Sequence, residues 1–189
     1  MTYPDLDRPG VDLIRISRGP ASALDAARAT WHHSPGLLSI TWYRSLDGTE
    51  ALTYEQWAAD ADLPSAPLPD SANYRIYRGG GIPDAPEPGV LVLVSMLFDP
   101  PGVDIAHRWI DLVFEAVEGM DRQPGSISGH FHVSLRGDRM INYALWTTQE
   151  AHAAFLTGQG RSEQNSELWD RVRNHPGTQQ GGFTYFRPL

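Results

Sequence analysis

The 189-residue chain contains neither cysteine nor lysine. Without cysteine it can form no disulfide, thiolate nucleophile, thiolate-bound haem or iron–sulfur cluster. Without lysine it can form no Schiff base with a carbonyl substrate or a pyridoxal cofactor. The longest uninterrupted apolar run, Val90–Val94, is far too short to span a bilayer, and residues 1–10 lack the pattern of a secretory signal. These absences predict a cytoplasmic protein.

Basic stretches are also absent from the chain. The formal net charge is −8 and the isoelectric point is about 5.2. Nucleic acid and anionic membranes repel an acidic protein without a basic patch, so we expect neither as a partner. Hydrophobic residues make up 41% of the chain, which is enough for one large core or two compact ones.

Two segments, 36–57 and 125–146, align without a gap at a constant offset of 89 residues, and seven aligned positions are identical. Chance alone would give about one or two identities at average residue frequencies. Similarity at a fixed offset is typical of a repeated module. The sequence therefore predicts two tandem domains, the first of residues 1–86 and the second of residues 87–189.

Each half contains strand patterns around a helical segment and a hairpin, which is the βαββαβ order of a ferredoxin-like domain. Apolar residues at helical spacing predict a helix over 104–117, and a turn containing glycine predicts a hairpin in each half. Further helices are expected over 20–31, 149–156 and 162–173, with at most a short one over 55–61. We expect an α+β fold in which two ferredoxin-like domains pack sheet to sheet.

Alternation along the second hairpin predicts a polar and aromatic strand face that is suited to line a pocket. Its members are Ser128, His130, His132, Ser134, Met140, Asn142 and Trp146. The aligned positions of the first hairpin include Thr41, Tyr43, Thr53 and Trp57. Because both histidines and the asparagine are missing from the first copy, we expect the principal site in the second domain and a structural or degenerate first domain.

The pair His130 and His132 has three interpretations. Two imidazoles on one strand face resemble part of a metal site, but no carboxylate follows at a spacing that would complete the ligands. Alternatively, each ring is hydrogen-bonded to neighbouring strand groups. The third interpretation is a role in binding or proton transfer, since histidine titrates near neutral pH. We expect no metal at this pair.

Asn142 and Trp146 have two interpretations. They are either an edge-strand amide and a core aromatic, or an amide that hydrogen-bonds a substrate carbonyl or enolate beside a flat aromatic wall. Trp109, on the helix expected over 104–117, either belongs to the core or covers a pocket.

The segment NYALWTTQEAHAAF, residues 142–155, resembles the antibiotic biosynthesis monooxygenase family. The resemblance implies ferredoxin-like domains that pair as dimeric α+β barrels, and it is compatible with a homodimer. Anthrone oxygenases of this family oxidise phenolic polyketides with O2 and need neither metal nor flavin. In them an Asn and a Trp four residues later face the substrate, and these correspond to Asn142 and Trp146. A His on the preceding strand corresponds to His132, whereas a downstream Tyr of some members falls near His152, where this chain departs from the pattern.

The family also contains haem-degrading enzymes, which carry an axial His on the helix after the Trp. In this chain the corresponding region, 155–158, has no histidine, and His152 lies closer to the Trp. We therefore expect no haem and no other cofactor, with O2 as a co-substrate.

The resemblance leads to a first hypothesis, a cofactor-independent monooxygenase that oxidises an anthrone-like or polycyclic phenolic polyketide in antibiotic biosynthesis. Asn142 would stabilise an enolate oxygen, and His132 or His130 would take the proton. The small aromatic substrate would be bound by Trp109, Tyr143, Ser128, Met140 and His152. Two alternatives remain open: a polyketide cyclase or aromatase on the same scaffold, and a non-catalytic protein that binds aromatic ligands or serves in assembly.

Overall fold

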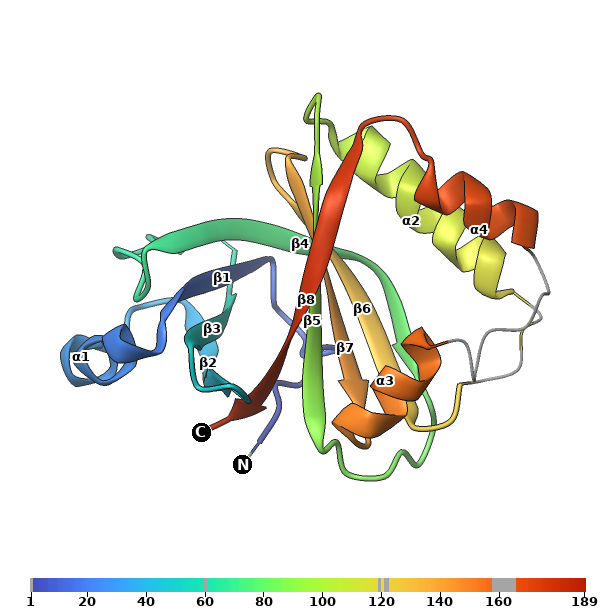
Figure 1. Ribbon diagram of the computed structural model, residues 1–189. Coiled ribbons are helices and arrows are strands. Elements are labelled where there is room, and N and C mark those ends of the chain that lie inside the picture. Colours follow the sequence, from blue (N-terminus) through green and yellow to red (C-terminus); the bar gives the residue numbers. More distant parts are fainter. Residues whose placement is uncertain (1, 60, 119, 121–122, 158–165) are drawn as a thin grey trace. The chain divides into compact units, whose positions relative to one another are not determined.

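The computed structural model describes residues 2–59, 61–118, 120, 123–157 and 166–189 (Figure 1). In chain order its strands are β1 (Leu13–Pro20), β2 (Leu37–Ser45), β3 (Glu50–Trp57), β4 (Asp70–Gly81), β5 (Val90–Phe98), β6 (Ser126–Ser134), β7 (Arg139–Trp146) and β8 (Thr178–Pro188). Its helices are the short 3-10 helix η1 (Ala21–Ala23), α1 (Leu24–Thr30), α2 (Val103–Val117), α3 (Gln149–Leu156) and α4 (Ser166–Arg173).

The hydrogen-bonded strand order is β1-β3-β2-β8-β5-β7-β6-β4, and this order closes on itself as a barrel. The predicted fold of two tandem ferredoxin-like domains packed sheet to sheet is therefore wrong. The difference comes from two long strands, β4 of 12 residues and β8 of 11 residues. The beginning of β4 pairs with β1 and its end adjoins β6, while β8 adjoins both β2 and β5. Because each long strand has a neighbour on both sides, the described strands leave no free sheet edge that would separate two domains.

Contacts group the chain into two compact units. Unit 1 comprises residues 1–75 and 185–189, and unit 2 comprises residues 76–184. The grouping divides both long strands, so each unit holds part of β4 and part of β8. The domain boundary at 86/87, which rests on the sequence repeat, stays a prediction.

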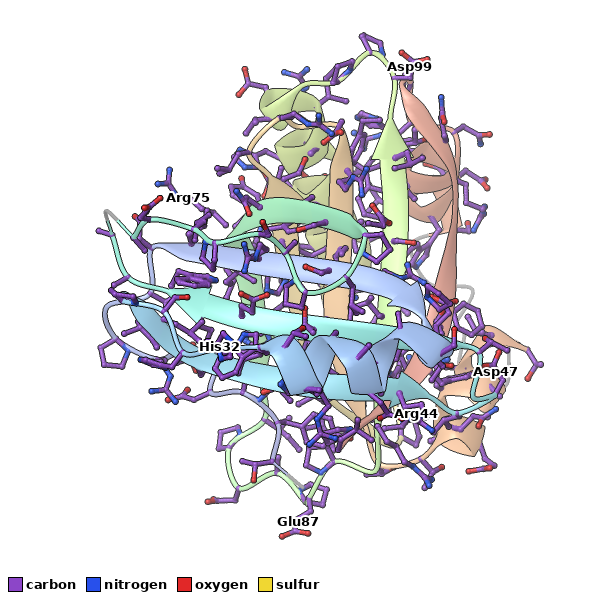
Figure 2. All side chains as sticks on the ribbon, turned by 90° about the vertical axis from the view of Figure 1, so that its left-hand side faces the viewer. His32, Arg44, Asp47, Arg75, Glu87 and Asp99 are labelled. Atoms are coloured by element: carbon purple, nitrogen blue, oxygen red, sulfur yellow. The ribbon has the colours of Figure 1, made fainter. Side chains whose placement is uncertain are left out.

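In unit 1, α1 lies over one face of the sheet formed by β1–β3 (Figure 2). Leu24, at the start of α1, is buried with Ala51 of β3 and with Leu68, and Trp42 of β2 packs against them. Asp47 marks the tip of the β2–β3 turn in the same view. Burial of these apolar side chains is what holds a helix this short, since it has too few turns to be stable alone.

Two helix predictions in unit 1 need correction. The helix expected over 20–31 begins later, because Pro20 ends β1 and a 3-10 turn precedes α1. The start of the segment 55–61 is strand, since β3 continues to Trp57 and pairs with β1 on one side and β2 on the other. Pairing on both sides outweighs the weak helical preference of these residues.

In unit 2, α2 and α4 lie side by side over one face of the strands (Figure 1). Phe131 of β6 and Met140 of β7 belong to the buried core that α2 covers with Trp109, Ile110 and other apolar residues. The buried residues of α2 recur at helical spacing along the helix. The helix predicted over 104–117 is therefore confirmed as α2.

Both predicted hairpins are confirmed. Their turns contain Gly48 and Gly137 with φ of 76° and 67°, a conformation that glycine adopts without a Cβ clash. The two ladders correspond pair by pair at the offset of 89: Ile40 lies opposite Glu55 in unit 1, and Gly129 lies opposite Ala144 in unit 2. Equivalent sequence positions of the two hairpins therefore occupy equivalent places.

Helix α3 follows β7 almost directly. The Thr148 side chain caps it by accepting a hydrogen bond of 3.1 Å from the Ala151 backbone N–H. The helix predicted over 162–173 is described from Ser166 onward as α4, and residues 162–165 lie outside the described part of the chain. None of the helices described is long and apolar enough to cross a membrane.

Candidate functional site

Unit 2 contains two adjoining hollows of about 480 Å³ each, between the strands and helices α2, α3 and α4, which together are called the cavity here. Two of the residues that line both hollows are polar, Asn142 and His152. The other residues that line both are Val94, Val113, Met120, Phe131, Phe155 and Trp169. A cavity of this size and composition fits a small, largely apolar ligand that a few polar groups orient.

Asn142 lies on β7, opposite Val94 of β5 and Phe131 of β6. Its Oδ1 atom is buried, and no described residue provides a hydrogen-bond partner for it. A buried amide oxygen without a partner costs about 1–3 kcal/mol, so a bound molecule that donates a hydrogen bond to it would be stabilised at this position. The amide can accept a hydrogen bond from a hydroxyl through its oxygen or donate one to a carbonyl or enolate through its nitrogen.

His152 lies on α3 among aromatic rings and is 5% exposed. Its ring centroid is 5.0 Å from that of Trp146 and 5.0 Å from that of Phe183, and both contacts are edge-on. Burial lowers the pKa of His152 below the ordinary value of 6.5, so the ring is neutral at pH 7. A neutral imidazole that lines a cavity can accept a proton from a bound ligand.

Four more of the predicted site residues line the cavity. Trp146 and Ser128 lie in one hollow, and Trp109 and Met140 lie in the other. The Trp109 indole N–H donates a hydrogen bond of 3.1 Å to the carbonyl of Val172, which ties the ring on α2 to α4. The indole is therefore a buried part of the cavity wall.

His130, His132 and Tyr143 do not line the cavity. In the β6–β7 ladder His130 lies opposite Tyr143, whereas Asn142 lies opposite Phe131. Directly opposed residues of an antiparallel pair share one face of the sheet, so both histidines face away from Asn142. The predicted common face of the two histidines with Asn142 is therefore wrong. The loop between the strands has an even number of residues, which pairs even-numbered residues of β6 with odd-numbered residues of β7.

The histidine pair is packed into the sheet. His132 is fully buried, and its Nδ1 atom lies 2.8 Å from the backbone oxygen of His130. Burial lowers the pKa of His132 to about 4, so it is neutral at physiological pH. The His130 ring lies close to the backbone of Gly79, where an added Cβ would come within 2.6 Å of Cδ2. This geometry favours the interpretation in which both rings contact neighbouring strand groups.

Several cavity residues were not predicted from the sequence: Phe131, Phe155, Trp169, Arg173 and Phe183. Phe131 could have been found from the hairpin register, once the parity of the loop is counted. Trp169 could have been found from the amphipathic pattern of α4, since it packs against the core beneath that helix. The positions of Phe155 and Phe183 depend on contacts between segments far apart in the chain.

The described residues contain no complete set of metal ligands. Within them, no three His, Asp or Glu side chains lie close enough together to hold a metal ion. His130 and His132 therefore have no third ligand among these residues.

In unit 1 the equivalent strand face carries a buried ion pair. Arg15 lies opposite Glu55, and its Nη2 atom is 2.6 Å from Oε2 of the carboxylate. The same carboxylate oxygen accepts a hydrogen bond of 3.1 Å from the Trp57 indole, and Arg15 also donates to the carbonyl of Pro64. Glu55 aligns with Ala144, so the position that borders a cavity in unit 2 carries a paired charge in unit 1.

Comparison with known proteins finds likeness at the level of structure only. No family model matches the chain, and no curated protein matches it. An anthrone oxidase-like protein has a TM-score of 0.70 and 15% identity, over 97% of this chain and 93% of that one. A ferredoxin-fold protein from Listeria monocytogenes, related to antibiotic biosynthesis monooxygenases, has a TM-score of 0.56 and 13% identity, over 98% of this chain and 100% of that one.

A haem-degrading enzyme from Listeria monocytogenes is also similar, with a TM-score of 0.52 and 13% identity, over 93% of this chain and 99% of that one. These proteins differ in their described activities, and identities this low show the fold alone. The chain therefore shares its fold with these proteins.

Proposed function

We propose that the protein is a cofactor-independent monooxygenase of the antibiotic biosynthesis monooxygenase type, which oxidises an anthrone-like or polycyclic phenolic polyketide with O2. The observation that carries the proposal is the buried, unbonded amide oxygen of Asn142, which lines an apolar cavity together with the neutral imidazole of His152. This pair offers a hydrogen bond to an oxygen substituent and an acceptor for a proton. The likeness in fold to an anthrone oxidase-like protein supports the choice of substrate class.

The reaction begins when His152 removes a proton from a phenolic hydroxyl or an acidic ring C–H. The resulting anion is electron-rich, and its oxygen accepts a hydrogen bond from the Asn142 amide. The anion transfers one electron to O2, and the substrate radical and superoxide combine at carbon. The peroxide takes the proton back from His152 and loses water, which leaves a carbonyl on the ring. One atom of O2 enters the product and the other leaves as water.

The role of proton acceptor, predicted for His132 or His130, is assigned to His152 in this proposal, because His152 is the one of these three that lines the cavity. The aromatic side chains of Trp146 and Phe131 offer flat surfaces for a polycyclic substrate. Ring contacts of this kind contribute about 0.5–1.5 kcal/mol each beyond the apolar area that they bury. A largely apolar surrounding also strengthens the hydrogen bond to Asn142.

A haem cofactor fits this cavity poorly. Haem needs an axial ligand with an open approach and cationic partners for its propionates. The ring of His152 has aromatic neighbours edge-on at 5.0 Å on Trp146 and Phe183. Among the described lining residues, Arg173 is the one arginine, and it is ion-paired with Asp170.

The test compares Asn142→Ala with Thr53→Ala, the equivalent position in unit 1, by O2 uptake with hydroxylated anthrones as substrates. We expect Asn142→Ala to lower turnover by about 10²–10³-fold, because it removes a hydrogen bond to developing negative charge. Thr53→Ala should leave turnover near the wild-type value. Mass spectrometry of product formed under ¹⁸O2 checks that one labelled oxygen is incorporated.

Other outcomes would decide against the proposal. Greater damage from Thr53→Ala than from Asn142→Ala would place the chemistry outside the cavity of unit 2. Product formed without O2 uptake would establish the cyclase or aromatase alternative, in which His152 and Asn142 act on the substrate without oxidation. Binding of aromatic ligands without any turnover would support a non-catalytic role. Besides O2, the proposed reaction requires only a small aromatic partner. A homodimer, and the lack of nucleic-acid and membrane partners, stay predictions.

A further inference from the structure

Two very small residues lie directly opposite each other on two strands that line the cavity. Gly129 of β6 pairs with Ala144 of β7, and both line one hollow. On β7, Ala144 lies two residues after Asn142 and two residues before Trp146, so the three side chains share one face. The pair therefore lies between the polar group and an aromatic wall of the site.

Gly129 leaves the space in which the Asn142 amide lies. A Cβ added at Gly129 would be 3.3 Å from Oδ1 of Asn142 and 3.8 Å from Nδ2. The shorter distance is tighter than ordinary van der Waals contact, so the amide would have to move by a few tenths of an ångström. The absence of a side chain at Gly129 therefore leaves the room that the Asn142 amide occupies.

The equivalent pair in unit 1 shows what larger residues do at this place. There Ile40 lies opposite Glu55, in the same register. Glu55 is fully buried in its ion pair with Arg15. At equivalent places of the two ladders, the larger pair of unit 1 thus carries a buried charge, whereas the small pair of unit 2 borders a cavity.

We infer that the Gly129–Ala144 pair determines the ligand specificity of the cavity. Ala144 leaves room for a flat fused-ring ligand beside Trp146, and Gly129 leaves the Asn142 amide where it can hydrogen-bond the hydroxyl group of that ligand. The assignment of this ligand as a substrate rests on the proposed function, but the binding itself does not. Enlarging Ala144 removes room for a second ring, and enlarging Gly129 displaces the hydrogen-bonding group. The two substitutions therefore have different signatures.

The experiment measures dissociation constants by calorimetry under nitrogen for phenol, 1-naphthol and 1-methoxynaphthalene. For Ala144→Val we expect the Kd of 1-naphthol to rise at least about tenfold, and that of phenol less than about threefold, because a single ring needs less depth. For Gly129→Ala we expect the preference for 1-naphthol over its methyl ether to fall from about fivefold to below about twofold, because the amide is displaced.

The matched control is Gly182→Ala, another strand glycine of unit 2, where an added Cβ meets nothing within 4 Å. It should bind all three compounds like the wild type, and far-UV circular dichroism and thermal unfolding confirm that each variant is folded. Wild-type binding by folded Gly129→Ala and Ala144→Val, or equal losses in Gly182→Ala, would overturn the inference. If these binding differences appear but no hydroxylated anthrone supports O2 uptake, the monooxygenase proposal fails and the specificity assignment stands.

Discussion

The buried ion pair of unit 1 makes a quantitative prediction about stability. Arg15 and Glu55 side chains are 5% and 0% exposed, and two nitrogen–oxygen contacts of 2.6 and 3.2 Å join them. Glu55→Ala would leave the Arg15 guanidinium buried without its carboxylate. Breaking a buried pair in this way costs about 3–5 kcal/mol, because the remaining charge stays desolvated. For a chain of this length that corresponds to a fall in Tm of about 6–20 °C.

The intact Arg15–Glu55 pair should contribute much less to the unfolding free energy than the cost of breaking it. Burial raises the pKa of Glu55, and the opposing effects of Arg15 and the Trp57 indole do not overcome it. The folded chain thus holds the carboxylate at a desolvation cost, even with its partner in place. Replacing both charges by apolar side chains, as in Arg15→Met with Glu55→Leu, should therefore change the unfolding free energy by less than about 1 kcal/mol or raise it.

The assay is urea unfolding at pH 7, followed by circular dichroism, together with differential scanning calorimetry. Asp12→Ala serves as the control, since it breaks the Asp12–Arg75 pair, whose side chains are 48% and 61% exposed; Arg75 is labelled in Figure 2. An exposed pair contributes about 0–1 kcal/mol. A loss below about 1 kcal/mol in Glu55→Ala, or a double variant as unstable as the single one, would refute the desolvation argument.

Two further predictions concern histidines of unit 2. The folded pKa of His132 is about 4 against an ordinary 6.5, so the unfolded chain binds this proton first as the pH falls. Between pH 6.5 and 4 the unfolding free energy of the wild type should therefore fall by up to about 3 kcal/mol more than that of His132→Gln. Equal losses for the two proteins in urea titrations would contradict this. Because burial lowers the pKa of His152, kcat/KM for O2 uptake should fall only below pH 6.5. His152→Gln should lose this acid limb together with about 10²–10⁴-fold in turnover, and an unchanged pH profile would exclude His152 as the base.

Features that depend on residues close in the chain could be predicted from the sequence. The glycine turns at Gly48 and Gly137 and the apolar spacing of α2 identified both hairpins and the main helix, because turn geometry and the helical period are local properties. Asn142 and Trp146 were placed together on one strand face for the same reason, since alternation along a strand needs no partner. The lack of cysteine and lysine excluded whole classes of chemistry without any structure.

The pairing of segments far apart in the chain was decided only by the tertiary structure. Closure of the strand order depends on the hydrogen-bonded neighbours of β4 and β8, which no local pattern specifies. Glu55 depends on such pairing too, since its partner Arg15 is 40 residues away in the chain. The position of His132 relative to Asn142, by contrast, follows from the parity of the β6–β7 loop, which can be counted in the sequence once both strand ends are known. Strand alternation says which residues of one strand lie together, whereas the residues they meet are set by long-range packing.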